Sequence, residues 1–210
     1  MKKNYLKYFL LCTFLLIISE TTKYFLLIDK LVYNSLAENL TSSQINNIIS
    51  LQKKWQWIGY LFVPIYVLLK TSIVASVLYI GTFFFNKNEI TFKNIWSIVI
   101  NAEFIFLLMP IFKIVWFYFF QTNYTLEDIQ YYFPLSAINI TGYKGIEAWL
   151  IYPLQTLNLF EVAYIIYLSH QIGSLTKTNA DDGLKIVSYS YLLALLLWVT
   201  VVMFFTLNYS

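Results

Sequence analysis

The sequence predicts an all-α fold, namely a polytopic transmembrane helical bundle of five spans with one or two short interfacial helices on the outer side. Hydrophobic residues make up 59% of the 210 residues and charged residues only 12%, whereas soluble domains carry about 25% charged residues. Five segments offer the roughly 20 mostly apolar residues that a helix needs to cross the hydrocarbon core. No tract of soluble-domain composition separates them, so residues 1–210 are expected to form a single transmembrane domain.

The apolar runs set the approximate bounds of the spans, which are 6–28, 57–85, 95–120, 149–171 and 185–207. The first run follows a basic start, but no A-x-A-like cleavage site follows it, so a retained first span is expected rather than a cleaved signal peptide. The second run is long enough to tilt or to project beyond the lipid. Short polar connections, "NKNEITFK" and "GSLTKTNADDG", join the second span to the third and the fourth to the fifth.

The distribution of lysines predicts the orientation of the bundle. With the N-terminus inside, the inner flanks hold seven lysines (Lys2, Lys3, Lys7, Lys87, Lys93, Lys177 and Lys185) and the outer flanks four (Lys30, Lys53, Lys54 and Lys144). Positive charge collects on the cytoplasmic side, and an odd number of spans separates the termini, so the N-terminus is expected inside and the C-terminus outside. The bias toward Asn, Ile, Phe, Tyr and Lys suggests an AT-rich bacterial genome and hence the cytoplasmic (inner) membrane.

Two outer loops, at about 29–56 and 121–148, carry helix signals. In the first, Ile45, Ile48 and Ile49 follow helical spacing after Ser42 or Ser43 as a cap, which predicts an interfacial helix leading into the second span. In the second, Thr125 is the predicted cap, Glu127 and Asp128 lie in the first turn, Pro134 ends the helix, and Ile129, Tyr132 and Phe133 form an apolar side. Both helices either lie on the membrane surface or form a lid or partner platform.

Six ionisable residues fall inside the predicted spans, and they are Glu20, Lys23, Lys70, Glu103, Lys113 and Glu161. A charge at the bilayer centre costs a few kcal/mol or more, so such residues are expected to face the bundle and find partners. Three carboxylates balance three ammonium groups, which favours structural ion pairs. A transport pathway or proton relay, the functional alternative, would more often leave one carboxylate unpaired.

Spacing and depth predict the partners of these charges. Glu20 and Lys23 are spaced i,i+3 and are expected to pair within one helix. Lys70 and Glu161 lie at similar depths, about 20 Å and 18 Å from their span starts, and are the predicted midplane pair. Glu103 and Lys113 lie about 15 Å apart along one helix, so each needs a partner from another helix.

The fourth predicted span carries polar residues along one side. At about 100° per residue, Gln155, Asn158 and Glu161 would cover an arc of roughly 120° on a continuous helix. This stripe is expected to face the other helices, and Pro153 permits a bend near the start of the span.

Several kinds of chemistry are disfavoured. The chain has one His, His170, and one Cys, Cys12, so neither a His-based metal site, a Ser-His-Asp triad nor a zinc cluster is expected. No HExxH, GxSxG, GxGxxG or P-loop pattern occurs, and the spans contain no Asp for aspartyl catalysis. We therefore expect no catalytic residues, cofactor or metal. With no Arg and a net charge of +3, nucleic-acid binding is not expected either.

The layout has five spans with the N-terminus inside and the C-terminus outside, a short inner loop between the second and third spans, and a third span of the form "NAEFIFLLMPIFKIVWF". In these features it resembles the bacterial branch of the Yip1-like membrane proteins, and 102–110 is the closest local match. Glu103 and Lys113 are more charge than that family leads one to expect. The resemblance implies a role in membrane organisation or trafficking rather than chemistry.

Three function classes follow from these observations. The leading one is a non-enzymatic multi-pass protein that acts as a partner-binding or assembly component, with the lipid bilayer and other membrane proteins as partners. The alternative is a transporter or permease subunit that uses the carboxylate stripe of the fourth span. It requires a water-accessible cavity that reaches Glu161 and a carboxylate without a Lys partner. An intramembrane enzyme is least favoured, and nothing in the sequence specifies a substrate.

Overall fold

The computed structural model describes residues 2–85 and 90–209, which are entirely helical apart from turns, loops and one isolated β-bridge. The elements are α1 (Lys2–Phe25), α2 (Ile28–Ala37), α3 (Ser42–Phe84), α4 (Phe92–Glu103), the 3₁₀ helix η1 (Phe104–Leu107), α5 (Leu108–Phe119), α6 (Leu126–Tyr131), α7 (Ile138–Thr141), α8 (Ala148–Thr156), α9 (Leu159–Leu175), α10 (Ala180–Val187), the π-helix η2 (Ser188–Leu192) and α11 (Leu193–Tyr209). The all-α prediction is confirmed for these residues.

Four helical segments of the described chain are long and apolar enough to cross a membrane, and they are 4–25, 42–84, 92–119 and 180–209. They match the first, second, third and fifth predicted spans. Large apolar side chains point outward along them; Phe62, Ile73 and Leu197 are 61%, 62% and 64% exposed. Contiguous apolar exposure of this kind marks a membrane or interaction surface. The chain is therefore a membrane protein.

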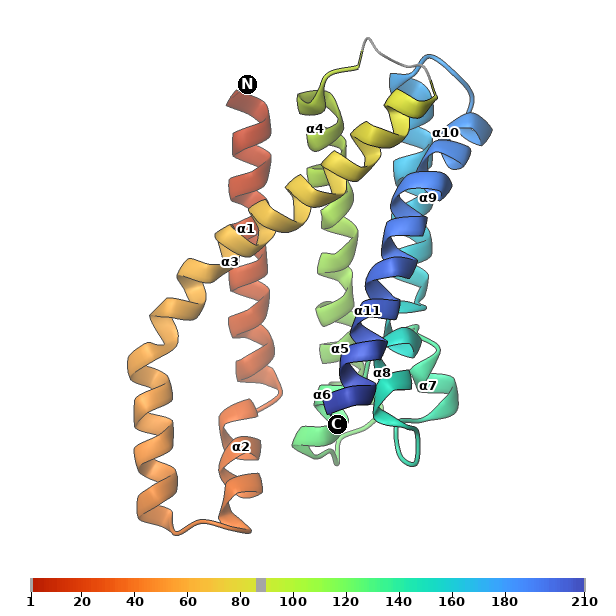
Figure 1. The fold of residues 1–210 in the computed structure, drawn as a ribbon. Helices are drawn as coiled ribbons and strands as arrows, with labels where there is room; N and C mark the ends of the chain where they lie inside the picture. The colour runs from red at the N-terminus through yellow and green to blue at the C-terminus, as the bar shows by residue number, and fades with distance from the viewer. Residues whose placement is uncertain (1, 86–89, 210) are drawn as a thin grey trace.

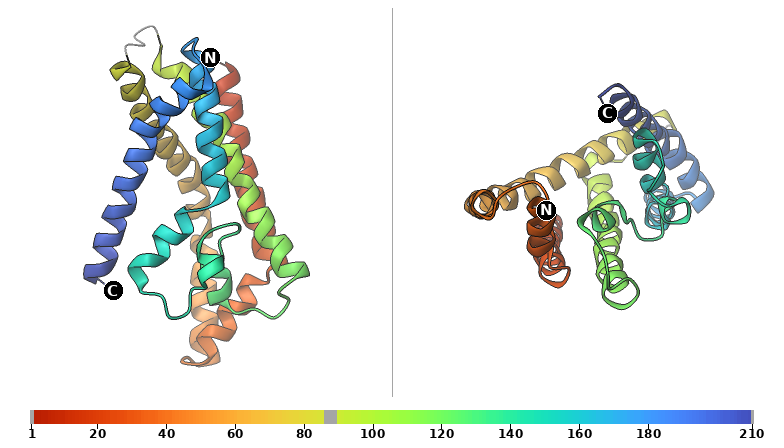
Figure 2. Two further views of the ribbon diagram at one scale, coloured as in Figure 1. Left: turned by 90° about the vertical axis from the view of Figure 1, so that its right-hand side faces the viewer. Right: turned by 90° about the horizontal axis from the view of Figure 1, so that it is seen from below.

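The chain runs from one end of the bundle to the other five times, so the two termini lie at opposite ends (Figure 1). Four passages are α1, α3, the α4–η1–α5 segment and the α10–η2–α11 segment. The remaining passage consists of α8 and α9, which are separate helices. Seen from below in Figure 2, α3 runs along one side of the bundle, where it contacts α1, α4, α10 and η2.

Helices occur at both positions where short helices were predicted in the loops, with differences in their bounds. The helix expected around Ile45–Ile49 is the first part of α3, which continues without a break into the second span, and its cap is Thr41 rather than Ser42 or Ser43. The Thr41 backbone N–H donates to Gln44 Oε1 at 3.0 Å, as in a capping box. The second, α6, has the predicted Thr125 cap, whose hydroxyl accepts from the Asp128 N–H at 3.2 Å. A further short helix, α2, was not predicted.

The predicted continuous helix over 149–171 is wrong. The chain leaves helical geometry at Leu157 and Asn158, between α8 and α9. The 135–137 segment lies alongside this break, where Leu159 N–H donates to Leu135 O at 3.1 Å and Ala137 N–H donates to Leu157 O at 2.9 Å. Irregular backbone is tolerated at membrane depth only where protein satisfies its hydrogen bonds, and the loop does so here.

The main core lies between α3, α4, α9 and the α10–η2 segment. Its fully buried members include Leu78, Ile95, Val99, Leu168, Ile172 and Val187. Two glycines allow α9 and the start of α10 to approach closely, because a Cβ at Gly183 would lie 2.0 Å from Ser169 O and one at Gly173 would lie 2.4 Å from Asn179 O. The core thus fixes α9, which carries Glu161, against α4, which carries Glu103. Lys87, which the orientation prediction counts on the inner side, lies outside the described residues.

Candidate functional site

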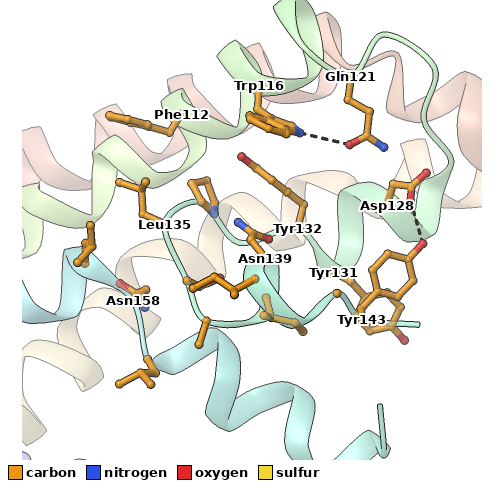
Figure 3. A pocket seen from close by; sticks show the side chains of 18 of the residues that line it. Phe112, Trp116, Gln121, Asp128, Tyr131, Tyr132, Leu135, Asn139, Tyr143 and Asn158 are labelled. Carbon is orange, nitrogen blue, oxygen red and sulfur yellow. Dashed lines mark hydrogen bonds between the residues drawn. The ribbon is translucent and has the colours of Figure 1, made fainter. Parts of the chain in front are cut away.

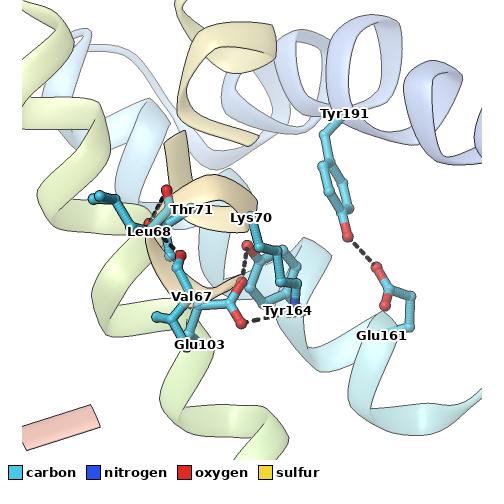
Figure 4. A network of polar contacts seen from close by, with 8 residues as sticks. All are labelled: Val67, Leu68, Lys70, Thr71, Glu103, Glu161, Tyr164 and Tyr191. Carbon is cyan, nitrogen blue, oxygen red and sulfur yellow. Dashed lines mark hydrogen bonds and ion pairs between the residues drawn. The ribbon is translucent and has the colours of Figure 1, made fainter. Parts of the chain in front are cut away.

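A network of polar side chains occupies the interior between α3, α4 and α9 (Figure 4). Lys70 Nζ lies 2.7 Å from Glu103 Oε2, and the Tyr164 hydroxyl donates to Glu103 Oε1 at 3.1 Å. The Lys70 ammonium also lies 4.3 Å from the centre of the Phe106 ring. Both oxygens of Glu103 therefore have a donor, and the charge of this buried carboxylate is matched by one ammonium group.

Local backbone structure places these groups. Glu103 is the last residue of α4, where the helix tightens into the 3₁₀ segment η1. Next to Lys70, the fully buried Thr71 accepts a hydrogen bond from Trp96 Nε1 at 3.1 Å, which joins α3 to α4. Because α3 and α4 are held together one residue from Lys70, the ammonium reaches Glu103.

Glu161 has a different kind of partner. The Tyr191 hydroxyl donates to Glu161 Oε1 at 2.5 Å (Figure 4). Among the residues whose side chains the structure describes, 4–85 and 90–209, no Lys ammonium lies within 4.0 Å of this carboxylate. Tyr191 belongs to the π-helix η2, and a π-helical turn inside an α-helix often marks a functional site.

The predicted Lys70–Glu161 pair is therefore wrong. The prediction compared depths on two straight helices, but the fourth passage is broken three residues before Glu161. Lys70 pairs with Glu103 instead. The prediction that Glu103 takes a partner from another helix is therefore confirmed.

The predicted polar stripe of the fourth span is also wrong, because no continuous helix carries it. Asn158 is the N-cap of α9, and its Oδ1 accepts from the Glu161 N–H at 2.8 Å. Its Nδ2 donates to Gln155 O at 2.9 Å and to Thr156 O at 3.0 Å, which satisfies the end of α8. The buried side-chain amide of Asn158 thus forms hydrogen bonds with backbone groups at both helix ends of the break. The Asn158-x-x-Glu161 spacing before an apolar run is the signal that indicates this helix start.

The predicted Glu20–Lys23 pair is not formed. Glu20 Oε1 accepts from the Tyr60 hydroxyl at 2.8 Å and from Gln56 Nε2 at 3.3 Å, both on α3. Glu20 therefore joins α1 to α3, and its side chain is exposed rather than part of the interior network.

Lys113 links α5 to the short helix α6. Its Nζ donates to Ile129 O at 2.6 Å and lies 5.4 Å from the centre of the Phe133 ring. A cation near the last carbonyl groups of a helix is stabilised by the helix dipole. This lysine thus holds α6 against the bundle and is not part of the Glu103 network.

A groove of about 980 Å³ lies at the end of the bundle opposite the N-terminus (Figures 1 and 3). We call it the outer groove. It lies between α5, the 121–143 segment and the start of α9, and aromatic side chains line much of it, including Phe112, Trp116, Tyr131, Tyr132 and Tyr143. Asn158, Leu159 and Val162, which lie close to Glu161 in sequence, also line it, whereas Glu161 itself does not. Of the two features that the transporter alternative requires, Glu161 therefore has the one, a carboxylate without a Lys partner among the described residues, but this groove does not supply the other, a water-accessible cavity that reaches it.

Asp128 is fixed at one end of the outer groove. Its Oδ2 accepts from the Thr125 N–H at 2.8 Å and its Oδ1 accepts from the Tyr143 hydroxyl at 2.8 Å. Burial raises the pKa of the Asp128 carboxyl, but the hydrogen bonds from Thr125 and Tyr143 outweigh burial and leave that pKa below its usual value. Partial burial and the hydrogen bond to Asp128 raise the pKa of Tyr143 to about 12. The carboxylate is thus ionised and the phenol neutral near neutral pH.

Within the described part of the chain, no three His, Cys, Asp or Glu side chains are grouped so that they could hold a metal ion. Comparisons with protein-family models, with curated proteins and with solved structures find no match, so the resemblance to the Yip1-like family stays a prediction. Sequence reasoning missed Tyr164 and Tyr191 as members of the interior network, because nothing distinguishes them among 18 tyrosines.

Proposed function

We propose that the chain is a non-enzymatic, five-span integral membrane protein of the transporter or permease class, which takes up and releases a proton at Glu161. One observation carries this proposal. Glu161 is an interior carboxylate whose partner is the Tyr191 hydroxyl and not a lysine, whereas Glu103 is matched by Lys70. An ionised group in low dielectric without a counter-charge is neutralised most simply by a proton. Intramembrane ionisable residues of this kind mark ion or proton pathways.

The backbone around Glu161 supports the same function. Three interruptions of regular α-helix lie at the interior network, namely the break at 157–158, the π-helix η2 and the 3₁₀ helix η1. Discontinuous helices near the midplane form the binding sites of many transporters, and short 3₁₀ or π stretches inside helices often mark hinges. Glu161 sits in the first turn after the break, which is where such a protein would change shape.

The proposed topology has five membrane passages, with α8 and α9 together forming the fourth. Support comes from the path of the chain, which traverses the bundle five times and leaves the termini at opposite ends (Figure 1). The lysine distribution favours the N-terminus inside, in a bacterial cytoplasmic membrane. The short helices α2, α6 and α7 then lie on the outer side, where α2 and α6 contact each other.

Cysteine labelling tests this topology. In a Cys12→Ser background, Asn39→Cys and Lys144→Cys are expected to react with an impermeant maleimide on intact cells, because both positions are exposed at the proposed outer end. Lys93→Cys and Asp181→Cys, exposed at the opposite end, are the matched controls and should react only after permeabilisation. The reverse pattern, or labelling of Asn39→Cys and Lys144→Cys from different sides, would overturn the five-span arrangement.

Carbodiimide labelling tests the proton site. A hydrophobic carbodiimide enters lipid, reacts with protonated carboxyl groups and leaves a stable adduct that mass spectrometry locates. In the reconstituted full chain, Glu161 is expected to be modified and the modification to decrease as the pH rises. Glu103, ionised against Lys70, is the internal control and should be spared. Absence of the Glu161 adduct at every pH, or preferential modification of Glu103, would contradict the proposal.

A second candidate function is the partner-binding or assembly role that the sequence favoured. The outer groove is the observation in its favour, because a large aromatic-lined cavity is a usual binding site. If Glu161 exchanges no proton, the interior network is structural throughout and this second function is preferred.

A further inference from the structure

The outer groove changes character along its length. At one end lie the apolar side chains of Phe112 and Leu135, and at the other Gln121, Asp128 and Tyr143 (Figure 3). Leu159, whose N–H donates to Leu135 O, and Val162 also belong to the apolar lining. A ligand that fits such a groove has an apolar part and a polar part. The inference drawn from this groove does not depend on the proton site at Glu161.

The position of the groove favours a membrane lipid as its ligand. Phe112, Leu159 and Val162 are 45%, 60% and 46% exposed, and they lie on passages that run the length of the bundle. The apolar end of the groove is therefore open toward the sides of the bundle, where a bilayer would surround it. The polar end lies beside α6, at the proposed outer face. This arrangement matches an amphiphile that enters from the outer leaflet.

The charge of the groove specifies the head group. Among its described lining residues, Asp128 is the one charged side chain. Its two oxygens accept three hydrogen bonds, from the Thr125 N–H, the Thr125 hydroxyl and the Tyr143 hydroxyl. An ionised carboxylate has about four acceptor sites, so it retains capacity for another donor. The nearby Lys144, whose Nζ lies 5.7 Å from the centre of the Tyr143 ring, is not among the lining residues, so the one charge of the described lining is negative and favours an ammonium group over an anionic head.

Aromatic rings and one amide complete the polar end. Tyr131 and Tyr143 stack at 4.9 Å, and Trp116 and Tyr132 stack at 5.4 Å between ring centroids. Aromatic faces attract ammonium groups through the ring quadrupole. Gln121 accepts from Trp116 Nε1 through its Oε1 at 3.2 Å, which leaves its side-chain NH₂ as a donor for a phosphate oxygen.

We propose that the outer groove binds a zwitterionic membrane phospholipid with a primary ammonium head, of the phosphatidylethanolamine class. The ammonium group lies against Asp128 and the stacked rings. The phosphate accepts from the Gln121 amide, and an acyl chain follows Phe112, Leu159 and Val162 toward the bilayer.

Quenching of tryptophan fluorescence by brominated lipid tests this assignment. The full chain is reconstituted into vesicles with equal amounts of phosphatidylethanolamine and phosphatidylglycerol, and only one of the two lipids is brominated. Trp116 lines the groove, so its own signal is the difference between the wild type and Trp116→Phe. Brominated phosphatidylethanolamine is expected to quench this signal several-fold more than brominated phosphatidylglycerol. Equal quenching by the two lipids, stronger quenching by phosphatidylglycerol, or no quenching by either lipid overturns the proposal. None of these outcomes depends on a variant of the polar end of the groove.

Asp128→Asn tests the role of the charge. Asn keeps an acceptor for the Thr125 N–H, and the lipid preference is expected to fall to equal quenching. Asp182→Asn is the matched control, because Asp182 occupies the same third helical position of α10, at the opposite end of the bundle. It should retain the wild-type preference. A preference that survives in Asp128→Asn would show that the carboxylate does not select the head group.

Discussion

Lys70→Met alone is expected to lower the free energy of unfolding by about 3–5 kcal/mol, because it leaves the buried Glu103 carboxylate without its counter-charge. Glu103→Gln alone should also lower the free energy of unfolding, but by less, since the side chain of Lys70 is 33% exposed and its unmatched ammonium is less buried than the Glu103 carboxylate. The double change removes both charges and should recover a good part of the loss. Thermal unfolding in detergent, with all four members of the cycle, measures the coupling.

Lys23→Met is the matched control for this cycle. Lys23 also lies in a predicted span, but it forms no ion pair among the described residues. Its removal should therefore change the melting temperature little. Additive effects of Lys70→Met and Glu103→Gln, with no recovery in the double variant, would refute the pairing.

Asn158→Leu is expected to produce the second large loss of stability. The amide caps α9 through the Glu161 N–H and satisfies the carbonyl groups of Gln155 and Thr156 at the end of α8. Loss of an N-cap costs about 1 kcal/mol, and each buried polar group left unpaired costs about 1–3 kcal/mol more. The sum is expected to exceed roughly 2 kcal/mol. Thermal unfolding measures it, and amide exchange should become faster across 155–162.

Asn179→Leu provides the comparison for Asn158→Leu. Asn179 caps α10 in the same way, with its Oδ1 accepting from the Asp182 N–H at 2.8 Å, but it is exposed. Water replaces the lost hydrogen bond there, so only the cap itself, about 1 kcal/mol, should be lost. Equal losses in the two variants would mean that Asn158 acts as an ordinary cap and does not hold the break.

Hydropathy was sufficient to predict the four helical segments of the described chain that are long and apolar enough to cross a membrane. An apolar segment in lipid must satisfy its backbone hydrogen bonds internally, so composition alone specifies a helix. The cap of α6 was also predictable, because Thr125 and Asp128 act within one turn of chain. Features that depend on neighbouring residues or on bulk composition are those that the sequence revealed.

The interior site depends on contacts distant in sequence and was predicted only in part. Hydropathy does not reveal the break at 157–158. The backbone groups at the break form their hydrogen bonds with residues 135–137, which a loop brings back to the bundle. That break invalidated both the polar stripe and the depth argument that paired Lys70 with Glu161. The prediction that Glu103 lies in the interior was correct. Its partners, Lys70 on α3 and Tyr164 on α9, are distant in sequence and were not predicted as its partners.

The central claim is that Glu161 exchanges a proton while Glu103 remains ionised against Lys70. Infrared difference spectroscopy of the protein in lipid, between about pH 6 and alkaline pH, observes directly those carboxyl groups that are still protonated above the range in which exposed Asp and Glu side chains, with pKa values of about 4, titrate. The account predicts a protonated-carboxyl band that titrates in the wild type, disappears in Glu161→Gln and persists in Glu20→Gln, whose carboxylate also accepts from a tyrosine but lies at an exposed position. A wild type without a titrating band, or a band that survives in Glu161→Gln, would contradict it.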